Sequence, residues 1–412
     1  MPVSAPIHAA PTGTRSSADA DAAINRLRDW AFEVLLPFWS EAGVTDAGYF
    51  FEELDFAGAP FPLTALHTRV QARQVYSFAH AALLTGSDLY RHRAQKGFAA
   101  MARLLWDEEH GGWMCSVKPD GGHLDPRCDA YDQCFALLAL AWLTRLGAPN
   151  TGMWIERSLA ALDRRLSAPR HGGYREFVPS AAGVPLPRRQ NPHMHLLEAF
   201  LALEAAGFEA DAAPLADAIA DLFMPLIERD GAIGEYFAEN WAPADGEAGL
   251  IREPGHQFEW AWLLLSYADA RRSTRAEAVA HRLASYGWNH GFDREDGHVP
   301  ALIERHDPAG LPMRDSKLLW PQTEAVKYFA QARRRGDRTA VDSASALATL
   351  IQTLFAQFVI AGGPLWRNQI SRSGILLAQT VPARLIYHIM TCVGVIGDAA
   401  DSGRGESESL AR

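Results

Sequence analysis

Two histidines in the second half of the chain are of the residue type that proton transfer at carbon requires. His256 lies in the motif PGHQFEW (254–260), and His388 lies in an otherwise apolar segment, 382–390. An imidazole titrates near neutral pH, so it removes and returns protons without a large pKa shift. A lone histidine among apolar residues is usually a hydrogen-bonded core residue. We nevertheless predict that these two act as a pair, because they share one phase of a repeat along the chain.

The segment around His256 is predicted to begin a helix. Pro254 suits a first helical turn, and His256 and Glu259 would then share one face at a spacing of three residues. We expect Glu259 to lie beside His256, where it either fixes the imidazole tautomer or binds a substrate hydroxyl. A core histidine capped by a carboxylate is the alternative. That alternative accounts for the nearby tryptophans better than for a buried ion pair.

Glycine turns beside aromatic or apolar residues recur along the chain, 61 to 66 residues apart. Their positions are Gly48, Gly112, Gly173, Gly234, Gly297 and Gly363. Self-similarity at a fixed period indicates a repeat architecture. Each turn precedes a short strand-like or irregular segment, then a helix that is apolar nearly all round, then an amphipathic helix such as 90–106 or 276–288.

An all-round apolar helix is typical of a buried inner position, and an amphipathic helix of an outer one. The six units therefore predict an all-α fold, an (α/α)₆ barrel of six helix-hairpin repeats with short β-hairpins at the active-site end. An open α-solenoid also stacks helix pairs, but its units are usually shorter and lack such inserts. We expect a single catalytic domain over 23–397, with disordered tails at 1–22 and 398–412.

One polar side chain in each unit falls near the start of the predicted inner helix. At a single helix start a polar residue is as easily a cap as a ligand. Six polar residues at equivalent positions of six units instead predict a central pocket at one end of the barrel. The residues are Arg73 (with Arg69 one turn earlier as the alternative), Tyr131, His195, His256, Glu324 and His388.

Composition narrows the range of partners. The chain has 412 residues and a formal net charge of −10, without a Lys/Arg-rich run, which argues against nucleic acid or an anionic membrane as a partner. Four cysteines without CxxC spacing, and no signal-peptide pattern or apolar span, predict reduced thiols and a cytoplasmic protein. Neither HExxH nor a nucleotide-binding motif is present, so we expect no metal and no cofactor.

The chain resembles the N-acylglucosamine 2-epimerase superfamily over about residues 31–397. The most specific marks of the resemblance are PGHQFEW (254–260), NPHMHLLEA (191–199) and WPQTE (320–324), supported by QARQVY (71–76), YDQ (131–133) and Tyr387-His388. The resemblance implies an (α/α)₆ barrel with His256 and His388 as its acid–base histidines. It further implies sugar contacts at Arg73, Tyr131, His195, Glu259, Trp320 and Glu324.

Tyr387-His388 resembles the mannose isomerase branch of that superfamily, and no basic cluster is large enough to demand a sugar phosphate. We therefore predict interconversion of free D-mannose and D-fructose through an enediolate by a monomer or homodimer. A sugar 2-epimerase of the N-acylglucosamine or mannose/glucose type is the second hypothesis. A glycoside hydrolase using Glu259 and Glu324 is the third, because other enzymes on this barrel use paired carboxylates. A non-catalytic carbohydrate-binding barrel also stays open.

Overall fold

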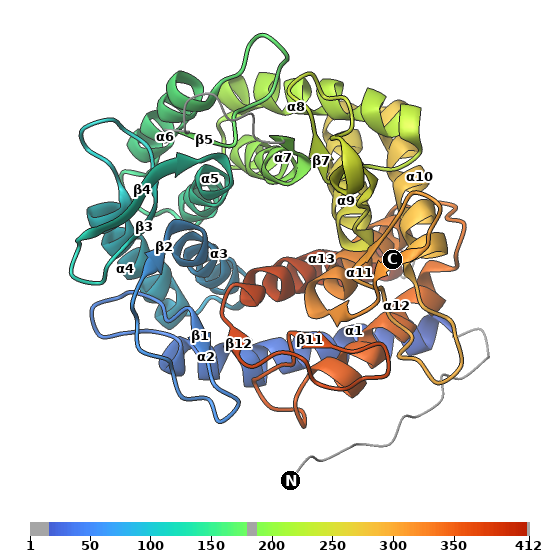
Figure 1. Cartoon of the computed structure of the whole chain (residues 1–412). Helices are drawn as coiled ribbons and strands as arrows, with labels where there is room; N and C mark the ends of the chain where they lie inside the picture. The colour runs from blue at the N-terminus through green and yellow to red at the C-terminus, as the bar shows by residue number, and fades with distance from the viewer. Residues whose placement is uncertain (1–15, 179–187, 410–412) are drawn as a thin grey trace.

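The computed structural model describes the backbone of residues 16–178 and 188–409, and side chains as far as 397. Its helices form two concentric rings around a central axis (Figure 1). Each inner helix packs against the next one along the chain, and the last packs against the first, so the inner ring is closed. Closure confirms the predicted (α/α)₆ barrel and excludes an open solenoid.

The helix boundaries follow the expected order of inner and outer elements. The inner ring comprises α3 (Thr68–Thr85), α5 (Ala130–Arg145), α7 (Gln190–Ala205), α9 (Pro254–Arg271), α11 (Leu319–Arg335) and α13 (Leu385–Ser409). The outer ring comprises α1 (Ser17–Trp30) continued by η1 (Ala31–Leu35) and α2 (Leu36–Ala42), then α4 (Asp88–Leu105), α6 (Thr151–Leu166), α8 (Glu209–Asp230), α10 (Thr274–Gly291) and α12 (Ser343–Thr353) continued by η3 (Leu354–Phe358).

The ends of the barrel differ from the expected boundaries at 23 and 397. Helix α1 begins at Ser17 and packs against α12 and α13, where Ala20 and Leu27 are buried. Residues 17–22 therefore belong to the barrel, and the last inner helix receives its outer partner from the N-terminus. Helix α13 is continuous to Ser409 and so passes the expected end at 397. Residues 1–15 and the side chains of 398–412 lie outside the described residues.

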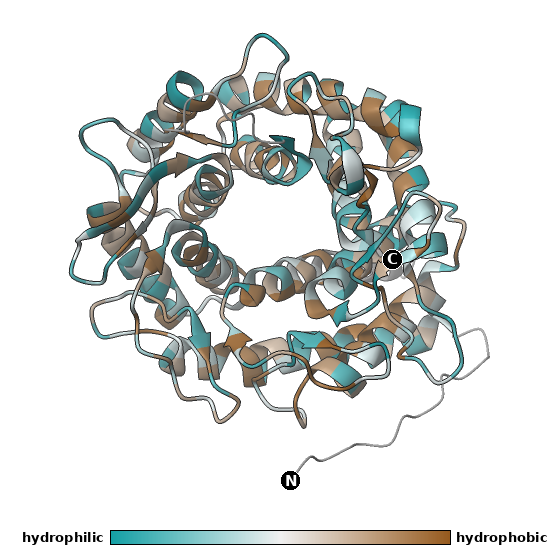
Figure 2. Ribbon diagram, viewed as in Figure 1, coloured by the Kyte–Doolittle hydropathy of each residue, from teal (hydrophilic) through white to brown (hydrophobic). Residues whose placement is uncertain are grey.

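Apolar side chains fill the space between the rings, and hydrophilic residues gather on the outward surface (Figure 2). Burying each inner helix on all sides removes its apolar surface from water, which is the main favourable contribution to such a fold. The four cysteines are buried and unpaired, in agreement with the expected reduced thiols. No helix in the described part of the chain is long and apolar enough to cross a membrane.

A side-chain clamp repeats near the start of five inner helices. The Gln133 amide accepts from the backbone N–H of Trp113 at 2.9 Å and donates to its carbonyl at 2.8 Å. The preceding Gly112 has φ of +101°, a conformation that favours glycine. The same bond to the backbone after a turn is made by Gln71, His193, Gln257 and Gln322. The clamp fixes each insert to its inner helix.

Short strands lie at the end of the barrel where the inner helices begin (Figure 1). They are β1 (Glu53–Leu54), β2 (Leu66–His67), β3 (Met114–Val117), β4 (His123–Asp129), β5 (Phe177–Val178), β6 (Arg188–Arg189), β7 (Tyr236–Phe237), β8 (Arg305–His306), β9 (Pro312–Arg314), β10 (Lys317–Leu318), β11 (Gln369–Ile370) and β12 (Val381–Pro382); a 3₁₀ turn, η2 (Gly246–Leu250), follows β7. Several pairings join neighbouring inserts, and β1 with β12 joins the first to the last. The inserts thus form a continuous rim.

Candidate active site

A cavity of about 250 Å³ opens at the strand-bearing end of the barrel. Seven of the eight predicted site residues line it, and Glu324 does not. The lining residues are Arg73, Tyr131, Asn191, His195, Glu253, His256, Glu259, Glu304, Arg305, Leu318, Trp320, Asn368, Arg384, Leu385 and His388. The sequence period therefore brings the predicted residues together.

The clamp repeat explains why these side chains converge. The clamping residue of each inner helix points outward to its own insert, so the residue two positions later points toward the barrel axis. That position holds Arg73, His195, Glu259 and Glu324 in four of the units. Because the inner helices are related by the ring, equivalent positions meet at one level of the axis.

His256 lies among carboxylates that the sequence analysis did not assign to it. Its Nδ1 is 2.9 Å from Glu235 Oε2 and 3.3 Å from Glu253 Oε2. Desolvation alone would lower the pKa of His256, but these two carboxylates outweigh it and raise the pKa to about 9. Of the two roles expected for Glu259, the hydrogen bond that fixes the His256 tautomer is made by Glu235 instead. An insert places Glu235 there across 21 residues of chain.

The other nitrogen of His256 meets Asn191, whose amide nitrogen is 3.2 Å from Nε2. The Asn191 side-chain oxygen has no partner among the described residues. An amide offers a donor at one end and an acceptor at the other. Asn191 can therefore hold either the neutral ring or the imidazolium by turning over. His256 is consequently equipped to give up a proton and take it back.

His388 has different surroundings. Its Nδ1 is 2.7 Å from Glu324 Oε1, and this leaves the Nε2 edge for the cavity. Glu324 in turn makes an ion pair with Lys327, and both side chains are fully buried. Desolvation, together with the positive charges of Arg73 and Lys327, lowers the pKa of His388 well below its ordinary value. His388 is therefore a neutral imidazole near pH 7, with a lone pair available as a base.

The third predicted histidine, His195, is buried at the centre of the barrel. Its Nδ1 is 3.0 Å from Glu198 Oε2, and the same carboxylate accepts from the Tyr387 hydroxyl. Desolvation lowers the pKa of His195 to about 4, so the ring is neutral. With Nδ1–H donating to Glu198, the other ring nitrogen presents an acceptor. His195 therefore presents an acceptor nitrogen at the cavity.

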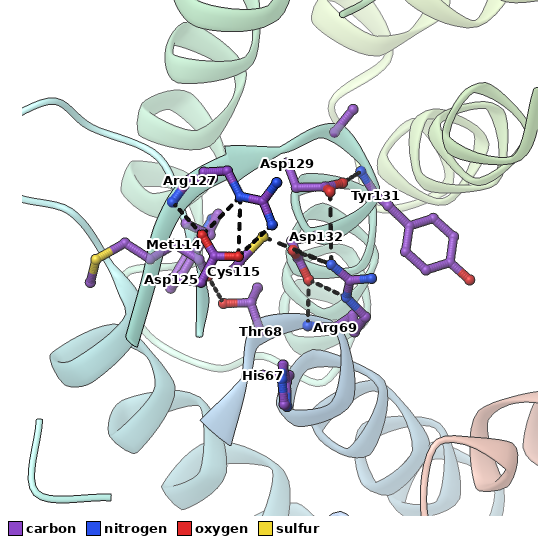
Figure 3. Close-up of polar contacts among 12 residues, drawn as sticks. His67, Thr68, Arg69, Met114, Cys115, Asp125, Arg127, Asp129, Tyr131 and Asp132 are labelled. Carbon is purple, nitrogen blue, oxygen red and sulfur yellow. Dashed lines mark hydrogen bonds and ion pairs between the residues drawn. The ribbon is translucent and has the colours of Figure 1, made fainter. Parts of the chain in front are cut away.

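Two arginines were candidates for the same role, and their environments separate them. Arg69 donates through Nε and Nη2 to the Asp132 carboxylate at 2.9 and 2.8 Å, and Asp129 lies 3.8 Å away (Figure 3). Arg73 lines the cavity, and its Nη2 donates to the Tyr131 hydroxyl at 2.6 Å. Arg69 is therefore tied into the rim, and Arg73 is the arginine that faces a ligand.

Glu259 presents the cavity with an oxygen that lacks a hydrogen bond to any described residue. Desolvation and the nearby Glu324 raise its pKa well above the ordinary range. A protonated carboxyl with a free oxygen both donates to and accepts from a hydroxyl. Trp320 stacks near both catalytic candidates, with ring centroids 4.9 Å from His256 and 5.6 Å from His388. Aromatic face and carboxyl together suit a sugar ring.

Three groups around the cavity have carboxylate and imidazole atoms close enough together to surround a cation. In each group the histidine Nδ1 already has a carboxylate partner, at Glu198, Glu235 or Glu324. The ammonium of Lys327 neutralises charge beside Glu324 without any metal. The imidazole and carboxylate atoms that lie close together in each group are thus already paired with one another.

Several residues of the site were missed in the sequence. Glu235 stood in one of the recurring glycine turns, and Glu253 directly preceded the PGHQFEW motif, so position alone could have indicated both. Lys327 carries no such signal, because a lysine in a helix usually faces solvent. Arg384 also gave no signal, since it lies between β12 and α13, outside the phase of the other site residues.

A closed double ring of helices, with two imidazoles of opposite pKa shift on one cavity, defines a barrel equipped for acid–base chemistry. Residues 48–392 match the family model for N-acylglucosamine 2-epimerase (GlcNAc 2-epimerase). The chain is 35% identical over 385 residues to a mannose-6-phosphate isomerase of Rhizobium meliloti, covering 90% of this chain and 96% of that protein.

It is 31% identical over 308 residues to a D-mannose isomerase of Thermobifida fusca, covering 70% of this chain and 74% of that protein. A solved structure of a D-mannose isomerase superposes with a TM-score of 0.81 at 20% identity, over 94% of this chain and 99% of the other. The chain belongs to the N-acylglucosamine 2-epimerase family. It is a sugar isomerase or epimerase.

Proposed function

We propose that the chain interconverts a mannose and the corresponding fructose, with His388 as the base at carbon and His256 as the acid at oxygen. The observation that carries the proposal is the opposite pKa shift of two imidazoles lining one cavity. An acid and a base that coexist at one pH need such separated pKa values. Relatives named for D-mannose and for mannose 6-phosphate support mannose as the hexose.

The reaction begins with ring opening. The imidazolium of His256 donates a proton to the ring oxygen, and the neutral imidazole then takes the proton of the anomeric hydroxyl, which restores the imidazolium and yields the open-chain aldehyde. His388 Nε2 then takes the proton from C2, and the electron pair moves to O1. Arg73 is the guanidinium that faces this developing oxyanion, and the charge of this buried side chain stabilises it.

In the second half of the reaction the protons removed in the first half are returned to the sugar. The imidazolium of His256 protonates O1 and then takes the proton from O2, C1 takes a proton from the His388 imidazolium, and C2 becomes the carbonyl of fructose. One base serving C1 and C2 on one face gives isomerisation. Two bases on opposite faces of C2 would give epimerisation. The 2-epimerase alternative stays open, because His256 and His388 reach the cavity from different helices.

The glycoside hydrolase alternative requires Glu259 and Glu324 to flank a glycosidic bond. Glu324 is hydrogen-bonded to His388 and paired with Lys327, and it does not line the cavity. This placement argues against that alternative, and we propose that Glu324 positions His388 through their hydrogen bond.

The test incubates the protein with mannose, fructose, glucose, N-acetylglucosamine and mannose 6-phosphate and identifies products by NMR. Fructose or its 6-phosphate formed from the matching mannose supports the proposal, and a chelator should leave the rate unchanged. Accumulation of N-acetylmannosamine, with mannose untouched, would move the chain to the epimerases. Turnover of none of these sugars would overturn the proposal.

A further inference from the structure

The cavity has two walls of opposite charge. On one side Glu253 and Glu304 line it together with Arg305, whose Nε is 3.0 Å from Glu253 Oε1 and 3.8 Å from Glu304 Oε1. On the other side Arg73, from α3, and Arg384, before α13, line it. An anionic part of a ligand would be repelled by the first wall and attracted by the second.

Arg384 stands out among the arginines of the cavity. Its side chain is exposed, and it makes no hydrogen bond or ion pair with any residue that the structure describes. Desolvation, and then the positive charge of Arg73, lowers the pKa of Arg384, and smaller contributions from Tyr131, Glu53 and Glu52 oppose this. An anion at this place would relieve an unfavourable charge.

Arg73 adds a second positive charge on the same side of the cavity as Arg384. Arg73 is 3% exposed, its Nη2 donates to the Tyr131 hydroxyl, and its Nε has no partner among the described residues. No carboxylate of the described chain forms an ion pair with Arg73 or Arg384. Arg305, by contrast, is already neutralised by Glu253. The second wall therefore carries two guanidinium charges without counter-charges.

The spacing of Arg384 and His388 fixes where the anion would sit. Arg384 immediately precedes the first residue of α13, and His388 lies in the first turn of that helix. Both residues line the cavity. Arg384 is therefore the nearer of the two to the strand-bearing end, on the same side of the cavity as the base that would act at C2.

We propose that Arg384 forms a subsite for a phosphate monoester at the end of the hexose remote from the reacting carbons. The inference rests on the proposed isomerisation for the orientation of the sugar. A guanidinium donates two parallel N–H bonds to phosphate, so a single exposed arginine is sufficient. A large basic cluster, which the sequence lacks, is not needed.

The test compares kcat/KM for mannose 6-phosphate with kcat/KM for mannose in each protein. Loss of a charge-assisted, bidentate contact should lower this ratio about 10- to 100-fold in Arg384→Gln. Arg384→Lys should recover part of the ratio. The matched control is Arg305→Gln, which removes an already neutralised arginine of the same cavity and should leave the ratio within about twofold.

Binding without turnover separates failure of this inference from failure of the proposed function. D-Mannitol 1-phosphate, an open-chain polyol phosphate that cannot isomerise, is titrated calorimetrically against the wild type and Arg384→Gln, with mannitol as reference. Tighter binding of the phosphate that disappears in Arg384→Gln supports the subsite even if no sugar is turned over. Mannose turnover with an unchanged ratio, and equal binding of the two polyols, would overturn it. Circular dichroism of each variant confirms folding.

Discussion

His256 and His388 are both buried imidazoles with a carboxylate at Nδ1, yet their pKa values are shifted in opposite directions. Part of the difference between the two pKa shifts lies in what each carboxylate contacts in turn. Glu235, behind His256, receives its second hydrogen bond from the neutral amide of Gln190, whereas Glu324, behind His388, makes an ion pair with Lys327. A carboxylate whose charge is neutralised by a neighbour does little to hold a proton on the ring. The cation behind the partner, together with Arg73 near His388 and the second carboxylate, Glu253, beside His256, separates the acid from the base.

Removing either ring is the largest perturbation of this comparison. His388→Asn and His256→Asn should each lower kcat/KM for mannose by about 10²–10⁴-fold, because a positioned acid or base typically contributes that much. Steady-state assays of the two variants give the measurement. Retention of more than a tenth of the wild-type rate in either variant would remove that histidine from proton transfer.

Lys327→Met should raise the pKa of His388, which is the direction in which the pKa of His256 is already shifted. Without the ammonium, the Glu324–His388 pair binds a proton more tightly, so the acidic limb of the kcat/KM profile moves to higher pH, by about 1 to 2 units. Breaking the buried pair should also destabilise the fold by about 3–5 kcal/mol, measured by urea unfolding. The double variant Glu324→Gln, Lys327→Met is the control and should regain part of the lost stability. An unmoved acidic limb would show that Lys327 does not tune His388.

Glu235→Gln makes the converse change. The pKa of His256, about 9 in the native protein, should fall, so the basic limb of the activity profile moves to lower pH. A raised folded-state pKa stabilises the protein fully below the unfolded value of about 6.5 and ceases to do so as pH rises through about 9. The free energy of unfolding at pH 6 should therefore fall in the variant and converge with the wild type near pH 10. A histidine titration by NMR that gives the same His256 pKa in both proteins would contradict the assignment.

Substitution of His193 is expected to have the smallest effect on activity, and it serves as a reference for the substitutions of His256 and His388. Its Nε2 accepts from the Tyr174 N–H at 2.9 Å, and its Nδ1 donates to the Arg189 carbonyl at 3.0 Å, so neither nitrogen is left for a ligand. The equivalent position in four other units is glutamine. His193→Gln should cost less than about 1.5 kcal/mol of stability, with kcat within about twofold, whereas His193→Ala should cost about 1–3 kcal/mol. Loss of activity in a folded His193→Gln would give this histidine a role beyond the clamp.

The sequence predicted the barrel because its glycine turns recur at the length of one helix pair. This spacing can be recognised even when the ends of individual helices are predicted a few residues away from their true positions. The same period predicted five of the cavity-lining residues, whereas Glu259 was predicted from its spacing to His256 and Trp320 from the family resemblance. It did not predict Glu235 as the partner of His256, because the side chain reaches across from an insert without regular secondary structure. It placed residues 17–22 in a tail, because nothing local shows that α1 completes the ring against α12 and α13. Burial of Lys327 and isolation of Arg384 depend on neighbours distant in sequence.

Solvent exchange at carbon tests the central claim most directly. The protein is incubated with mannose in deuterated water, and the appearance of deuterium at C1 of fructose and C2 of recovered mannose is followed by NMR. The account predicts incorporation at both carbons in the wild type and incorporation slowed by at least about 100-fold in His388→Asn. Incorporation at the wild-type rate in His388→Asn would contradict the assignment of His388 as the base.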